Sequence, residues 1–232
     1  MLNRKLKVLY EDNHLLAIAK PVNLATMGVQ EGETSAVTLC KAYLKEKYQK
    51  PGNVYLGVVS RIDRLVSGVL IFARTSKAAA RLSQQFREKT TKKIYQAIVP
   101  YSNFAQQSQL ANQGHLVDWV RKNEREQRMV VVNETASKAQ RAELVIVDSQ
   151  RLGKLSRLSI ELITGRKHQI RLQLSEHGMP ILGDKKYGSQ HKFDEGIALH
   201  ALELTIQHPI KKEPLVIRCP VPNAWKRYTN PT

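Results

Sequence analysis

An acidic side chain flanked by two arginines is the group in this sequence best suited to chemistry. Arg61, Asp63 and Arg64 lie in a polar segment that ends at Ser67-Gly68, between two apolar runs. A carboxylate on a loop between strands can act as a nucleophile or a base, because the scaffold fixes it while the loop exposes it. The same three residues are equally consistent with a surface ion cluster, which contributes little to stability.

The chain carries a large excess of positive charge. Its 232 residues include 37 Lys and Arg against 20 Asp and Glu, a formal net charge of +17. Such an excess favours a polyanionic partner, nucleic acid or an acidic membrane surface, although a merely solvated basic surface is the alternative. No apolar run approaches the roughly 20 residues of a membrane helix, and no cationic amphipathic helix is evident. We therefore expect no membrane partner, a cytoplasmic location, and RNA or DNA as the partner.

Three further segments combine basic residues with groups that could contact a nucleic acid. The segment LITGRKHQIRLQL (162–174) holds Arg166 and Lys167, and on a helix its His168 and Arg171 would share a face. Tyr95 lies in the basic strand KKIYQA, where an aromatic ring could stack on a base or, alternatively, pack in a sheet core. The third segment, ILGDKKYG (181–188), is a basic loop bounded by glycines.

Signatures of metal and cofactor binding are missing from the sequence. It contains no G-x-G-x-x-G, no G-x-x-x-x-G-K-[ST], no C-x-x-C, no H-E-x-x-H and no G-x-S-x-G. Cys40 and Cys219 are too few for a disulfide framework and indicate free thiols in a reducing compartment. His168 and His177, nine apart on a short helix, would not face one another. We expect neither a metal nor a cofactor.

Hydrophobic periodicity predicts strands around each helix rather than a strict alternation of the two. A helix from Lys77 to about Lys89 would begin at an N-cap Ser76 and bury every fourth residue, and another would follow Thr34-Ser35. A short helix in HQIRLQLSEH would end at Gly178. The polar segment 101–115 is expected to be a loop. The predicted strands are 6–10, 15–19, 54–59, 69–73, 92–100, 128–133, 142–148, 155–163, 197–207 and 215–219.

This pattern predicts an α+β (mixed α/β) protein in which a mixed, mostly antiparallel sheet is flanked by helices and loops. The segments SRIDRLVSGVLIFARTSKAAARL, KKIYQAIV, ITGRKHQIRLQL and ILGDKKYG occur in the order seen in RluA-type pseudouridine synthases, and VLYEDNHLLAIAKPVNL resembles the first block of that family. The resemblance covers about residues 7–220. It implies a bent sheet of the pseudouridine synthase fold, forming a single catalytic domain over 1–232 without an N-terminal S4-like module.

The resemblance also implies an activity: isomerisation of specific uridines in structured RNA to pseudouridine, without metal or cofactor. Asp63 matches the catalytic aspartate, and whether it attacks the ribose or base or removes a sugar proton is left open. Arg171 matches the arginine expected to pair with that aspartate. Tyr95 matches the tyrosine that stacks on the target base and helps to remove the C5 proton. Arg61 matches the arginine that replaces the extruded base.

Two positions depart from the family pattern: Ser60 stands where His is usual, and Val66 where Thr is usual. Neither supplies the nucleophile, so we expect activity to survive. An inactive RNA-binding or ribosome-assembly protein on the same fold is the alternative, against which the joint retention of the three catalytic residues argues. The partner would be ribosomal or transfer RNA, bound by a monomer. The residues expected to bind this RNA, besides Arg61, are Arg64, Lys92, Lys93, Arg166, Lys167, His168, Lys185 and Lys186.

Overall fold

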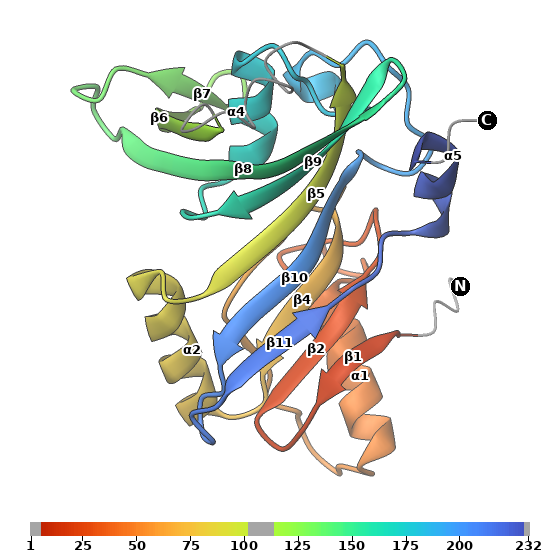
Figure 1. The fold of residues 1–232 in the computed structure, drawn as a ribbon. Helices are drawn as coiled ribbons and strands as arrows, with labels where there is room; N and C mark the ends of the chain where they lie inside the picture. The colour runs from red at the N-terminus through yellow and green to blue at the C-terminus, as the bar shows by residue number, and fades with distance from the viewer. Residues whose placement is uncertain (1–5, 102–113, 230–232) are drawn as a thin grey trace. The chain divides into compact units, whose positions relative to one another are not determined.

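The computed structural model describes residues 6–101 and 114–229, which divide into two compact units (Figure 1). The first unit comprises Met1–Lys92 and Ala201–Pro220, and the second comprises Lys93–His200 and Val221–Thr232. Most of the segment expected to be a loop at 101–115 lies outside the described residues.

The first unit is built on antiparallel strands. In it, β1 pairs with β2, β2 with β4, β3 with β4, and β10 with β11. The strand predicted at 54–59 is only two residues long, because the residues before Gly57 form no ladder with β4. Its elements are β1 (Val8–Glu11), β2 (Leu15–Lys20), α1 (Ala36–Lys47), β3 (Gly57–Val58), β4 (Ser67–Ala73), α2 (Ser76–Glu88), β11 (Pro214–Arg218) and most of β10 (Leu199–Gln207).

Helices cover both faces of these strands, which explains why β2 and β4 are continuous apolar runs. Leu15 and Ala17 of β2 pack in one cluster with Leu82 of α2, whereas the alternate residues Leu16 and Ile18 pack with α1. Successive side chains of a strand point to opposite faces, so the two helices lie on opposite sides of the unit (Figure 1). The unit therefore has two apolar layers, one on each side of the strands.

The helices of the first unit begin at hydroxyl caps. The helix predicted after Thr34-Ser35 is present, and Ser35 caps it in a capping box with Thr38. The cap of α2 is Thr75, one residue before the predicted Ser76, because the Thr75 Oγ1 accepts the hydrogen bond from the backbone N–H of Ala78 at 3.2 Å. Cys40 and Cys219 are buried free thiols, as predicted, and burial raises the pKa of Cys40 to about 12.

Gly68 at the start of β4 is required by a close approach of two backbone segments. Its φ is +121°, and a Cβ there would lie 2.2 Å from the carbonyl oxygen of Ala201. Such a separation is far inside van der Waals contact, so the backbone of β10 can approach β4 only if residue 68 has no side chain. This glycine thus fixes the end of the segment that carries Asp63.

We expect Gly68→Ala to lower the free energy of unfolding by about 2–4 kcal/mol, since it combines backbone strain with overpacking. The measurement is thermal unfolding followed by circular dichroism. Gly153→Ala is the matched control, because Gly153 also has a positive φ of 62° but nothing lies within 4 Å of its added Cβ. The control should cost only about 1–2 kcal/mol. Equal losses in the two variants would contradict the close-approach argument.

The second unit is an antiparallel sheet in the order β5-β9-β8-β6-β7. The sequence missed β6, because its apolar residues alternate poorly and only Leu116 and Val120 are buried. The helix predicted in HQIRLQLSEH is present, and Gly178 follows it with a φ of 73°. The elements are β5 (Lys92–Pro100), β6 (His115–Asn123), β7 (Arg128–Val132), β8 (Gln140–Leu152), β9 (Leu155–Leu162), α4 (Gln169–Glu176), η1 (Lys185–Tyr187), η2 (Asn223–Trp225) and α5 (Lys226–Thr229).

The predicted α+β class with a mostly antiparallel sheet is confirmed. Among the described helices, none is both long and apolar enough to cross a membrane.

Candidate active site

Asp63 lies on a short loop of the first unit that is held in place by its own backbone. The carbonyl of Asp63 accepts a hydrogen bond from the N–H of Val66 at 3.1 Å, closing a turn. The preceding residue, Ile62, is fixed by Thr26, whose Oγ1 donates to the Ile62 carbonyl at 3.0 Å and accepts from the Ile62 N–H at 3.3 Å. The Asp63 side chain is half-buried. Its carboxylate is therefore presented from a loop with a defined conformation.

A buried lysine joins this loop to the end of β2. Lys20 is only 1% exposed, and its ammonium donates to the carbonyls of Pro21 and Leu24, each at 2.8 Å, and of Arg64 at 3.4 Å. Carbonyl oxygens stabilise a buried ammonium that would otherwise be costly to desolvate. Lys20 thus anchors the turn at Asp63 to the sheet, while the side chains of Arg61 and Arg64 stay exposed.

In the second unit, a glutamine holds the start of α4. The first six residues of α4 are all buried. The Gln169 Oε1 accepts from the Thr164 hydroxyl at 2.7 Å and the Arg166 N–H at 2.9 Å. Its Nε2 donates to the Glu143 carbonyl at 3.0 Å and to the Gln173 Oε1 at 2.9 Å. The side-chain amide thereby uses both of its donors and both lone pairs of its oxygen. These hydrogen bonds connect the loop 165–168 to β8.

Arg171 of α4 forms a buried, two-pronged ion pair with Asp184. Its Nε lies 2.7 Å from Asp184 Oδ2 and its Nη2 lies 2.8 Å from Oδ1. The two side chains are only 4% and 1% exposed. A parallel pair of charge-assisted hydrogen bonds orients the planar guanidinium as well as neutralising it. Asp184, in the predicted ILGDKKYG loop, is thus a partner of Arg171 that the sequence analysis did not name.

Tyr187 brings His168 and Arg171 together. Its hydroxyl lies 2.9 Å from Nδ1 of His168 and accepts a hydrogen bond from the Met129 N–H at 3.2 Å. The Arg171 guanidinium carbon lies 5.1 Å from the Tyr187 ring centroid, in cation–π range. Tyr187 thus contacts both His168 and Arg171. The predicted helix, however, begins only at Gln169, and His168 precedes it in a left-handed conformation with a φ of 52°, so the two residues do not lie on one helix as expected.

Tyr95 is half-buried in β5. Ala97 and Val99, on the same face of the strand, are fully buried. The alternative that this face of the strand packs in the sheet core is thus correct for Ala97 and Val99, but Tyr95 is only partly covered. At the start of the strand, Lys92 is exposed and Lys93 is half-buried.

The other predicted RNA-binding residues of the second unit have varied surroundings. Arg166 is half-buried and donates from Nε to the Arg141 carbonyl at 3.0 Å. Lys186 donates to the Gln127 carbonyl at 2.7 Å. Lys167 and Lys185 have exposed side chains. Among the described residues, no group of three His, Cys, Asp or Glu side chains is placed to hold a metal ion.

The predicted site residues therefore belong to two groups. The first unit carries Asp63 between its two arginines, and the second unit carries Tyr95 and Arg171. The pairing of Asp63 with Arg171 stays a prediction. The supporting roles of Gln169, Asp184 and Tyr187 were missed, because each depends on contacts between segments far apart in the chain. The role of Gln169 could have been suspected from the sequence, because a polar residue among the apolar positions of a buried helix needs hydrogen-bond partners.

Comparison with known proteins agrees with these features. Residues 14–176 match the family model described as RNA pseudouridylate synthase. The chain therefore belongs to the RNA pseudouridine synthases, specifically the RluA type, which isomerise uridine in RNA to pseudouridine. The predicted family and activity are confirmed.

Individual relatives cover almost the whole chain. The dual-specificity RNA pseudouridine synthase RluA of Haemophilus influenzae is 31% identical over 210 residues, 90% of each protein. The uncharacterized RNA pseudouridine synthase YhcT of Bacillus subtilis is 33% identical over 223 residues, which are 96% of this chain and 70% of that protein. The structure of human RNA pseudouridylate synthase domain containing 4 has a TM-score of 0.72 at 22% identity, covering 96% of this chain and 93% of that one. That similarity confirms the pseudouridine synthase fold.

Proposed function

We propose that this chain modifies uridines of ribosomal or transfer RNA with Asp63 as its catalytic carboxylate. The observation that carries the proposal is the half-buried carboxylate on a turn held by Thr26 and Lys20, with an exposed arginine on either side in the sequence. A fixed carboxylate has a lower entropic cost of reaching the ribose or base than a mobile one. The monomeric state and the cytoplasmic location also belong to this proposal.

The remaining residues are assigned by the steps that the isomerisation requires. The N1–C1′ bond breaks, the base turns, a C5–C1′ bond forms, N1 gains a proton, and the C5 proton leaves to water. Tyr95 stacks on the target base and assists the loss of the C5 proton. Arg171, whose guanidinium is oriented by Asp184, stabilises the ionised Asp63. Arg61 fills the space of the extruded base, since a planar guanidinium can restore part of the lost stacking.

Loss of the C5 hydrogen allows a direct test. Purified protein incubated with total cellular RNA carrying uridine tritiated at C5 should release tritium to water. RNA binding without any release would instead favour an inactive RNA-binding protein. Mapping of modified uridines in a strain that lacks the gene would then identify the target RNA.

A further inference from the structure

A basic hollow of about 760 Å³ lies in the second unit. It is formed by the β6–β7 hairpin, the segment 133–140 and Lys167. We call it the basic hollow. Its charged lining residues are Arg121, Lys122, Arg125, Lys138, Lys167 and a lone acid, Glu124. Only Met129 and Val130 contribute apolar side chains to this lining, and the other lining residues are polar or charged.

The positive charge of the basic hollow is largely uncompensated. Glu124 forms an ion pair with Lys122, and this hydrogen bond lowers the pKa of Glu124, which keeps the carboxylate ionised. Within the described ranges, no ion pair involves Arg121, Arg125 or Lys167, and all three side chains are exposed. Like charges gathered in one concave surface repel each other and raise the local concentration of anions. The basic hollow therefore favours a polyanion over a neutral or cationic ligand.

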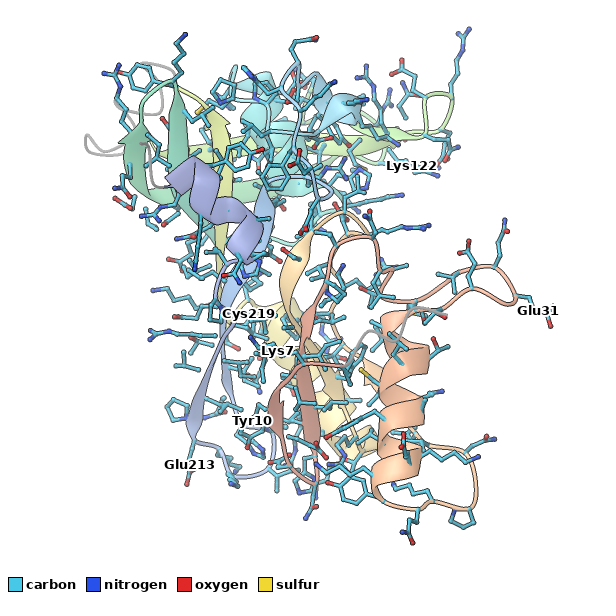
Figure 2. The ribbon with its side chains drawn as sticks, turned by 90° about the vertical axis from the view of Figure 1, so that its right-hand side faces the viewer. Lys7, Tyr10, Glu31, Lys122, Glu213 and Cys219 are labelled. Carbon is cyan, nitrogen blue, oxygen red and sulfur yellow. The ribbon has the colours of Figure 1, made fainter. Side chains whose placement is uncertain are left out.

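The hairpin that forms the basic hollow is fixed to the predicted site of the second unit. The Met129 N–H donates to the Tyr187 hydroxyl, and Lys186 donates to the carbonyl of Gln127 at the hairpin turn. The turn is also held by Asn123, whose side-chain oxygen accepts hydrogen bonds from the backbone N–H groups of Arg125 and Glu126, at 3.0 and 3.2 Å. Tyr187 in turn contacts His168 and Arg171. Figure 2 labels Lys122 on this hairpin.

We propose that the basic hollow binds the phosphodiester backbone of the substrate RNA; this inference rests on the proposed function. Long, exposed Lys and Arg side chains contact phosphates without reading sequence, so the basic hollow contributes affinity and register rather than base recognition. A single RNA backbone strand fits a concave surface with cations on several sides better than the flat surface of a membrane does. An acidic protein segment is the competing partner that the experiment below would reveal.

The test compares two triple variants that lose the same charge. Arg121→Gln, Arg125→Gln and Lys138→Gln together remove three cations of the basic hollow. Lys41→Gln, Lys45→Gln and Lys50→Gln remove three exposed cations of the first unit and serve as the control. The dissociation constant of a fluorescent RNA stem-loop with uridines in its loop is measured between about 50 and about 200 mM KCl.

We expect the triple variant of the basic hollow to raise the dissociation constant about tenfold or more. The slope of the logarithm of the dissociation constant against the logarithm of the KCl concentration should also decrease by about 2–3, because each phosphate contact contributes about 0.7–0.9 to that slope. In tritium release, the variant should lose kcat/KM through a higher KM. The control should keep the wild-type slope. Equal slopes for the two triple variants would overturn the proposal, as would an RNA affinity that is unchanged while an acidic peptide binds less tightly.

A second variant, which removes a negative charge instead of positive ones, tests the proposal even if the triple variant fails to fold. Glu124→Gln removes the lone acid of the basic hollow, so RNA binding should tighten and its salt slope should steepen. Failure of Glu124→Gln to tighten binding would also contradict the proposal. A wild-type protein that binds RNA but releases no tritium would overturn the proposed function alone, since the salt slopes of the variants still test the basic hollow.

Discussion

Asp63→Asn is expected to lower tritium release from C5-labelled uridine at least about a thousandfold, because removal of an essential catalytic group from an active site has effects of this size or larger. Asparagine has nearly the same shape as aspartate, so the turn closed by the Val66 N–H should be preserved. The amide lacks the negative charge that either attack on the substrate or proton removal requires. The measurement is single-turnover tritium release from total RNA.

RNA binding by the Asp63→Asn protein should stay within about threefold of wild type, since the loss of a negative charge does not weaken attraction to phosphates. Asp148→Asn is the matched control, because Asp148 is exposed in β8 and undergoes the same change of charge. The control should retain full tritium release. Substantial turnover by the Asp63→Asn protein would refute the assignment of Asp63, whatever its RNA affinity.

Asp184→Asn is expected to destabilise the second unit by about 3–5 kcal/mol, the usual consequence of removing one partner of a buried ion pair. The Arg171 guanidinium is 4% exposed and would lose the carboxylate that receives its two parallel hydrogen bonds. Urea unfolding followed by tryptophan fluorescence measures this loss selectively. Both tryptophans of the chain, Trp119 and Trp225, belong to the second unit.

The control for this prediction is an exposed ion pair of the same unit. The Glu126 carboxylate pairs with Nε of Arg128, and the two side chains are 48% and 44% exposed. Glu126→Gln should therefore cost only about 0–1 kcal/mol in the same fluorescence measurement, because water solvates both partners when the pair is broken. Similar losses in Asp184→Asn and Glu126→Gln would show that burial of the Arg171–Asp184 pair contributes nothing special to stability.

Most elements of the fold were predictable, because their signals are local. The strand predicted at 92–100 coincides with β5, and Gly178 follows α4 as expected. Hydroxyl caps, glycines and apolar periodicity act over a few residues, so they can be recognised without knowing the rest of the chain. The clearest exception is β6, in which only Leu116 and Val120 are buried and the apolar residues do not alternate regularly with polar ones. Its identity as a strand comes from pairing with β7 and β8.

The sequence by itself determined the family and the order of the motifs that carry Asp63, Tyr95 and Arg171, since these are properties of linear segments. Only the tertiary structure decided what surrounds them. The bridge from Met129 to Tyr187 joins residues 58 apart in the chain, and the Arg171–Asp184 pair joins residues 13 apart. The net charge of +17 is likewise a linear property. The grouping of five of its cations in the basic hollow depends on folding, because strands and loops distant in sequence must meet before their cations share one surface.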